Sequence, residues 1–207
     1  MAKEVLGTEA LGGVLIVDRF SAYNRAPCAL QYCYAHLLRD VEDLQPEFPT
    51  DTEVSAFTAT LIPLLAEAMQ LRRQPVTDAE YYRRAQQLKA KLILETSESA
   101  QHPGIRKLQD IFCDKAERLY HWVESRAVPA ENNRAERELR PTVIARKVSF
   151  GSQSETGAKT REILMTLLCT LRKRVKRPQT RLKEVLDQLA CDPQADALNL
   201  LWVADTS

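Results

Sequence analysis

Two acidic residues stand in settings that suit divalent-metal chemistry. Asp18 ends GVLIVD, an apolar run rich in β-branched residues, which predicts a buried strand over residues 13–18. In α/β sheets, ligands and catalytic groups gather at the carboxyl ends of strands. Glu136 lies on a predicted helix within ENNRAERELR. Carboxylates of this kind suit Mg²⁺, and a pair of such ions can clamp the attacking and leaving oxygens of phosphoryl transfer.

The stretch ENNRAERELR, residues 131–140, has an unusual composition for a solvated helix. Glu136 stands among Arg134, Arg137 and Arg140, and two asparagines, which are poor helix formers, precede it by one turn. Arginines beside a metal ligand suit a substrate that carries phosphates. The competing interpretations are structural: an i,i+4 ion pair of Glu136 with Arg140, at roughly 0.3–0.5 kcal/mol, and a turn-forming role for Asp18.

Cys33 and His36 have the spacing of half a structural zinc site. No second pair with suitable spacing follows, so a packing pair at a helix start is the favoured interpretation, and zinc binding is left open. Of the other histidines, His102 is expected in a loop and His121 beside Trp122. Neither is a candidate general base.

The composition is that of a soluble protein of 207 residues, with 44% hydrophobic and 28% charged residues. No apolar stretch approaches the roughly 20 residues of a membrane span, and the N-terminus lacks the apolar core of a signal peptide. Five scattered cysteines suit reduced thiols. The sequence therefore predicts a cytoplasmic protein without a membrane partner.

A net charge of +1 conceals a basic block. Residues 134–183 hold 14 Lys or Arg against four Glu, a net charge of +10. Such a block predicts a surface for a polyanion, with phosphate contacts that do not depend on base sequence. The alternative is a basic face that is only solvated.

The chain is predicted to be α+β and mostly helical. A segment over residues 31–44 should begin as a strand and pass into a helix, and residues 50–125 have helical patterns that Pro63 should bend or interrupt. A further helix should start after Pro129 and stop at Pro141. Residues 142–160 are expected as a strand or turn and then a loop, before helices over 161–177 and 181–190.

Three segments, GVLIVDRFSAYN, CYAHLLRD and ENNRAERELRP, resemble the DDE transposases of the insertion sequence 66 family. An Asp-x-x-x-Ala-Tyr motif is matched by Asp18, Ala22 and Tyr23, and a Cys-x-x-His-x-x-Arg motif by Cys33, His36 and Arg39. The motif of the last acid is matched by Asn132, Asn133, Ala135, Glu136, Arg137, Leu139, Arg140 and Pro141. ARKVSFGSQSETGA follows with Arg146, Lys147 and Gly157, and the resemblance covers roughly residues 12–175.

The resemblance implies a partial ribonuclease H-like core with a helical insertion. Its expected parts are a sheet remnant with the second catalytic Asp (1–45), the insertion (46–126), the helix of the third acid with a basic segment (127–178), and a C-terminal helix and tail (179–207). Asp18 and Glu136 would be catalytic residues and ligands of Mg²⁺ or Mn²⁺. The residues expected to contact transposon-end DNA are Arg39, Asn132, Asn133, Arg137, Arg140, Arg146 and Lys147, and Cys33 and His36 form a structural motif.

The sequence departs from the family pattern in two ways. Glu131 stands where the family often has Asp, which affects a helix cap and not the metal site. The first catalytic Asp should lie on an earlier strand, but only 17 residues precede Asp18 and none is an aspartate. Two carboxylates hold Mg²⁺ weakly, so metal binding is expected only if the missing carboxylate is supplied.

Three functions follow as hypotheses. The first is a DDE transposase or transposase fragment that is not active alone in DNA cleavage and strand transfer. The second is a DNA-binding or interaction protein that partners or inhibits a full-length transposase or pairs with an upstream fragment. The third is a hydrolase with Asp18 and Glu136 as acid and base, which the arginine-rich setting favours least.

Overall fold

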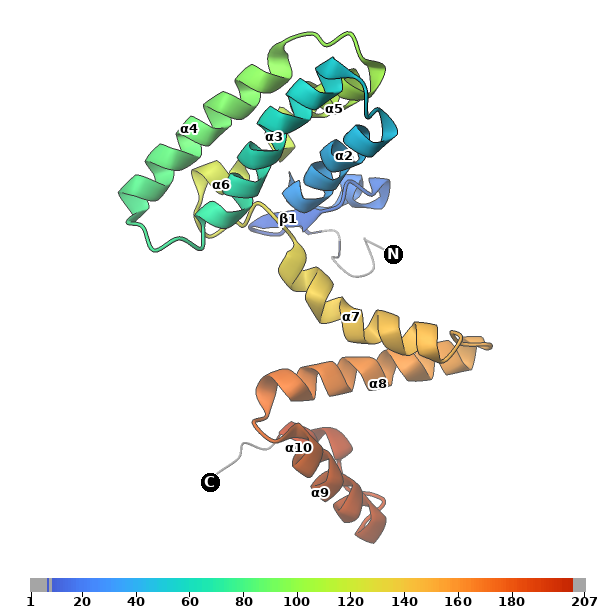
Figure 1. Cartoon of the computed structure of the whole chain (residues 1–207). Coiled ribbons are helices and arrows are strands. Elements are labelled where there is room, and N and C mark those ends of the chain that lie inside the picture. Colours follow the sequence, from blue (N-terminus) through green and yellow to red (C-terminus); the bar gives the residue numbers. More distant parts are fainter. Residues whose placement is uncertain (1–6, 8, 203–207) are drawn as a thin grey trace. The chain divides into compact units, whose positions relative to one another are not determined.

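The computed structural model describes residue 7 and residues 9–202 in two compact units, residues 1–136 and 137–207 (Figure 1). The elements of the first unit are β1 (Val14–Val17), η1 (Ser21–Arg25), β2 (Ala29–Tyr32), α2 (Tyr34–Glu47), α3 (Thr52–Leu71), α4 (Asp78–Ser97), α5 (Pro103–Asp114), η2 (Ala116–Arg118) and α6 (His121–Glu124). Helix α7 (Asn133–Val148) contains the boundary between the units. The second unit continues with α8 (Glu155–Arg174), α9 (Pro178–Cys191) and α10 (Ala197–Trp202).

The two strands pair in parallel, with Val14 opposite Ala29 and Val17 opposite Tyr32. A strand directly before Asp18 and a strand that passes into a helix near residue 33 were both expected, and both are confirmed. The chain is mostly helical, also as expected, with this short parallel pair as the sheet of its described part.

Helices α2 to α6 form the core of the first unit and cover the strand pair. Helix α3 buries Val54, Leu61, Leu65, Ala68 and Leu71, a spacing that places them on one helical face. Helix α3 is also long and apolar enough to cross a membrane by length and composition. Its buried face shows that the helix serves here as a core helix, which is consistent with a soluble protein.

Buried tyrosine side chains of α2 and α4 hold the segment from the end of η2 to α6. Tyr34 Oη donates to the carbonyl of Leu119 at 2.9 Å, and Tyr81 Oη donates to the carbonyl of Trp122 at 2.6 Å. These bonds join segments 85 and 41 positions apart. They fix the end of the bundle from which the chain returns to the strands.

The second unit has a small core of Leu171, Val185 and Leu201. Ser154 caps α8 by accepting a hydrogen bond from Gly157 N at 3.1 Å. Apolar side chains that stay exposed in this unit are Leu139, Val143, Ile144, Val148, Phe150, Ile163, Leu164, Leu168, Leu186 and Leu198. The unit therefore leaves much apolar surface uncovered by its own residues.

Two local predictions were wrong, the end of a helix at Pro141, which lies inside α7, and the strand or turn and loop over residues 142–160. Pro63 lies inside α3, so of the bend or interruption expected there the interruption does not occur. A proline removes one backbone hydrogen bond and bends a helix, but favourable neighbouring residues carry the helix past it. Residues 142–148 are accordingly helical, and the Ser154 cap makes residues 155–160 the start of α8. His102 lies outside the helices, as expected, and its side chain caps α5.

Candidate functional site

The carboxyl ends of β1 and β2 lie side by side and place two predicted site residues at one sheet edge. Asp18 directly follows Val17, Cys33 directly follows Tyr32, and these two strand residues are register partners. Cys33 N donates to the carbonyl of Val17 at 2.9 Å. Because neighbouring strands are about 4.8 Å apart, Asp18 and Cys33 leave the sheet next to each other.

Asp18 is exposed at this edge. Its carboxylate accepts a hydrogen bond from Phe20 N at 3.1 Å, so part of the turn-forming role considered for it is present. The exposed carboxylate keeps further lone pairs for other ligands.

Cys33 and His36 occupy the start of α2. Cys33 is the N-cap residue with a side chain only 1% exposed, and His36 follows in the first turn. Residues three apart on a helix share a face, so both side chains point to the same side of the helix start. The expected packing pair at a helix start is present, and a third side chain that could donate a ligand atom to a metal ion lies beside it.

Glu136 is that third donor. Its Oε1 lies 3.7 Å from His36 Nε2, and one ligand atom each of Cys33, His36 and Glu136 lies within 4.8 Å of the other two. Among the described residues, the ion pair found for Glu136 is this one and not the i,i+4 pair with Arg140 that was considered from the sequence. Asp18 is not a member of this three-residue group.

Two backbone contacts bring Glu136 to α2. Tyr34 N donates to the carbonyl of Ala130 at 2.9 Å, and Asn132 N donates to Cys33 Sγ at 3.2 Å. Glu136 N then bonds to the carbonyl of Asn132 at 3.1 Å, which starts α7. The residues directly before α7 are thus held against the Cys33 turn, and Glu136 follows in the first turn of the helix.

Burial raises the pKa of the Cys33 thiol, and the hydrogen bond from Asn132 N offsets part of this rise. A thiol with a raised pKa is protonated at neutral pH and is a poor nucleophile. Cys33 is therefore suited to packing and not to covalent catalysis, and a cation that binds its sulfur has to displace the thiol proton.

Glu131 was missed as a site-forming residue. Its side chain is 6% exposed, pairs with Arg73 after α3, and accepts a hydrogen bond from Asn133 N at the start of α7. A carboxylate at a helix N-terminus satisfies a free backbone N–H and favours the helix dipole. The sequence signal was its position directly before the asparagine pair, which indicated a cap but not a buried ion pair.

Arg19 and Asp40 were also missed. Arg19, next to Asp18, has a φ of 70° and forms an ion pair with Asp40 of α2. The left-handed backbone is uncommon outside glycine and turns the chain directly after β1. No signal in the sequence marked this pair, because the two residues are 21 positions apart.

The residues predicted to contact DNA fall in both units. In the first unit Arg39 is exposed, and Asn132 and Asn133 are half-buried at the start of α7. In the second unit the exposed residues are Arg137, Arg140, Arg146 and Lys147, all on α7. Each arginine and lysine of the set is accessible to a phosphate.

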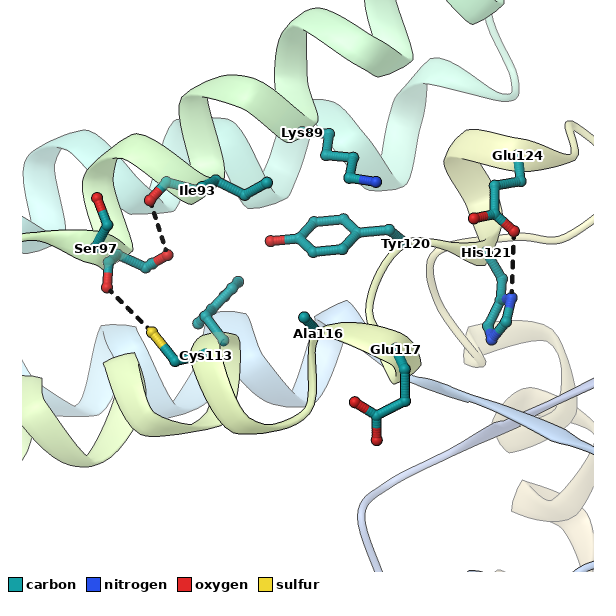
Figure 2. A pocket seen from close by; sticks show the side chains of 11 residues that line it. Lys89, Ile93, Ser97, Cys113, Ala116, Glu117, Tyr120, His121 and Glu124 are labelled. Atoms are coloured by element: carbon teal, nitrogen blue, oxygen red, sulfur yellow. Dashed lines mark hydrogen bonds and ion pairs between the residues drawn. The ribbon is translucent and has the colours of Figure 1, made fainter.

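A separate cavity of about 490 Å³ opens among α4, α5 and α6 (Figure 2). The Tyr120 side chain extends into it, Lys89 Nζ lies 5.0 Å from the centre of the Tyr120 ring, and His121 Nδ1 lies 3.7 Å from Glu124 Oε2. The Tyr120 hydroxyl is buried without a hydrogen-bond partner in the described chain. Neither Asp18 nor Glu136 lines this cavity.

Comparison with known families assigns the chain to one of them. The family model for the IS66 family of transposases matches residues 1–160. The chain belongs to the IS66 transposase family. A search of curated proteins and a search of solved structures each found no match.

The IS66 match covers every residue of the sheet edge and of the Cys33, His36 and Glu136 group. It also covers the acidic, asparagine and arginine motifs on which the predicted resemblance rested. Helices α9 and α10 lie beyond the matched residues.

Proposed function

We propose that this IS66-family chain contributes two of the three acids of a DDE active site, Asp18 and Glu136, to metal-dependent cleavage and strand transfer of DNA in transposition. The observation that carries the proposal is the parallel strand pair. Its register places Asp18 beside Cys33, and Glu136 lies against Cys33 and His36. The two acids, 118 positions apart in the sequence, thus have a common neighbour in Cys33, which Asp18 adjoins through the strand register and Glu136 through its side chain.

The parallel strands and the insertion of α3 to α6 between the two acids support a partial ribonuclease H-like core. The proposed parts are the four ranges 1–45, 46–126, 127–178 and 179–207. A cytoplasmic location fits the access to chromosomal DNA that a transposase of this family needs.

The oxygen donors fit Mg²⁺ or Mn²⁺. Such ions bind through one or two carboxylates together with water and phosphate oxygens, and Asp18 is exposed while Glu136 is half-buried. When bound, the ion supplies positive charge that stabilises the attacking and leaving oxygens of a phosphodiester. The chain's own part is to hold the two carboxylates at the edge and to present arginines to the phosphates.

No aspartate precedes Asp18 in these 207 residues, so the first acid of the family pattern is not matched in them. Two acids alone leave Mg²⁺ or Mn²⁺ weakly held. We therefore expect metal binding by the isolated chain to be weak, to be measurable only when phosphate oxygens of bound DNA supply further ligands, and cleavage to be absent.

Metal binding tests the shared role of the two acids. With transposon-end duplex present, Mn²⁺ binding followed by electron paramagnetic resonance should weaken several-fold in Asp18→Asn and in Glu136→Gln. Glu117→Gln is the matched control, since Glu117 is an exposed glutamate that is not part of the edge. Unchanged Mn²⁺ binding in either edge variant would contradict the proposal.

Cleavage is the second readout in the same system. Robust nicking of the end duplex by the isolated chain, lost in Glu136→Gln, would show that no further carboxylate is needed.

A second function is supported by the surface of residues 137–207. Exposed apolar side chains on α7 and α8 suit a protein partner, and the basic block suits DNA, so the chain can act as a DNA-binding partner or inhibitor of a full-length transposase. Adding the chain to a cleavage reaction of an active IS66-family transposase should then change its rate. An unchanged rate at saturating chain would exclude this function.

A further inference from the structure

We propose that Cys33, His36 and Glu136 form a binding site for a thiophilic divalent cation of the Zn²⁺ class. The three side chains offer one sulfur, one nitrogen and one oxygen donor from two separate segments. Sulfur and imidazole donors select Zn²⁺, whereas Mg²⁺ prefers oxygen alone. The donor chemistry of this group therefore differs from that of an acid pair.

The spacing of the donors is close to that of a tetrahedral site. Zinc–ligand bonds of about 2.0–2.3 Å place neighbouring ligand atoms roughly 3.3–3.7 Å apart. The His36 Nε2 to Glu136 Oε1 distance is already 3.7 Å, and no pair of ligand atoms in the group exceeds 4.8 Å. Side-chain movements of about 1 Å complete the geometry, which leaves a fourth position for water.

The two segments that supply the donors are joined before any cation binds. Asn132 N donates to Cys33 Sγ, and Tyr34 N donates to the carbonyl of Ala130. Glu136 follows one helical turn after Asn132, so its carboxylate lies near the side chains of Cys33 and His36. A site held in this way loses little conformational entropy when the cation binds.

The His36 ring is available as a ligand. Its Nδ1 is buried and has no hydrogen-bond partner in the described part of the chain, and its Nε2 faces Glu136. The contact with Glu136 orients the ring toward the group. His36 therefore presents Nε2 to the Glu136 carboxylate, and its Nδ1 is the nitrogen left without a partner.

Binding at this group has a consequence that rests on the proposed function. Glu136 is one of the two proposed ligands of Mg²⁺, so a thiophilic cation held by Cys33 and His36 competes for it. Zinc should then oppose magnesium-dependent chemistry at the sheet edge. The binding site itself does not depend on that chemistry.

Cobalt(II) titration of the full chain tests the site, because a cobalt–thiolate bond gives a charge-transfer band in the near ultraviolet. The wild type should show this band at one equivalent, and Zn²⁺ but not excess Mg²⁺ should abolish it. Cys33→Ser should lose the band, and His36→Asn and Glu136→Gln should weaken Co²⁺ binding by about tenfold or more.

Matched variants separate this site from other thiols and from the acid pair. Cys113→Ser and Cys191→Ser remove exposed cysteines outside the group and should keep the band. Asp18→Asn should also keep it, even though it weakens Mn²⁺ binding under the proposed function. A band that persists in folded Cys33→Ser, or Co²⁺ affinity unchanged in both His36→Asn and Glu136→Gln, would overturn the site. Loss of Mn²⁺ binding alone would not affect it.

Discussion

At the scale of single residues, buried polar groups of the described chain differ in whether they have hydrogen-bond partners. Gln31 is fully buried, yet its amide donates to the carbonyl of Leu119 at 3.0 Å and accepts from His121 N at 3.0 Å. Tyr120 is also buried, but its hydroxyl has no partner. An unpaired buried hydroxyl costs free energy, whereas a paired amide joins the segments that it contacts.

Burial raises the pKa of Tyr120 to about 12, above the usual value of 10. Between these pH values the unfolded chain releases the tyrosine proton and the folded chain keeps it. The contribution of Tyr120 to the free energy of unfolding is therefore fully present below pH 10 and decreases as the pH rises toward 12. We expect the free energy of unfolding of the wild type to decrease by about 1 kcal/mol relative to that of Tyr120→Phe between pH 9 and pH 11.

Urea unfolding of both proteins at pH 7, 9, 10 and 11 measures this difference. Tyr34 and Tyr81, whose pKa values burial also raises, are present in both proteins and cancel. At pH 7 the variant should be at least as stable as wild type, because it lacks the unpaired hydroxyl. A stability difference that stays constant over this pH range contradicts the explanation.

At the scale of elements, prolines lie inside helices that continue through them. Pro63 is exposed in α3, and Pro141 is exposed in α7. Helix α3 continues because its buried face on both sides of Pro63 packs into the core. Tertiary packing therefore outweighs the local cost of the proline.

Pro63→Ala should raise the free energy of unfolding by about 1–2 kcal/mol. Alanine restores a backbone hydrogen bond and favours the helix, and part of this gain is offset because the unfolded chain becomes more flexible. Thermal unfolding followed by circular dichroism measures the change. The control is Ala66→Ser, a substitution in the same helix that leaves the backbone hydrogen bonds intact. A melting temperature at or below that of wild type would show that the proline fits α3 without cost.

Helix α7 depends on a contact that local sequence does not reveal. Glu131 accepts from Asn133 N and pairs with Arg73, which lies 58 positions earlier. The asparagine pair therefore starts a helix whose first turn is held by the helical bundle. This explains how two poor helix formers can stand at the start of α7.

At the scale of the whole molecule, the charge is divided along the chain. Residues 134–183 carry a net charge of +10, whereas the whole chain carries +1. The last turn of α8 holds Arg172, Lys173 and Arg174, all exposed. Exposed positive charge in such density favours phosphate contacts and association with nucleic acid.

Replacing Arg172, Lys173 and Arg174 together by Gln should weaken duplex DNA binding at every sequence tested. The slope of log affinity against log salt should fall in magnitude by about one for each phosphate that these side chains no longer neutralise. Fluorescence anisotropy from low to moderate salt measures both effects. The matched control removes three exposed charges of the other unit, Lys91, Arg106 and Lys107, and should have a smaller effect. Equal weakening in the two triple variants would show that binding follows net charge and not the basic block.

Much of the fold was predictable from short-range patterns. The strand before Asp18, the strand-to-helix passage at Cys33 and the helices between residues 50 and 125 follow from apolar periodicity, which acts over a few residues. The errors at Pro141 and over residues 142–160 arose where a helix continues past a proline and where the Ser154 cap starts the next helix.

The amino-acid sequence by itself determined the family, the segregated charge and the two candidate acids, because residue types and their local spacing carry that information. Only the tertiary structure decided which side chains surround Glu136. Its neighbours Cys33 and His36 lie about 100 positions away, and the contact between Asn132 and Cys33 spans 99. Contacts of that range depend on how a whole helical bundle returns the chain to its strands, and no local pattern encodes that path.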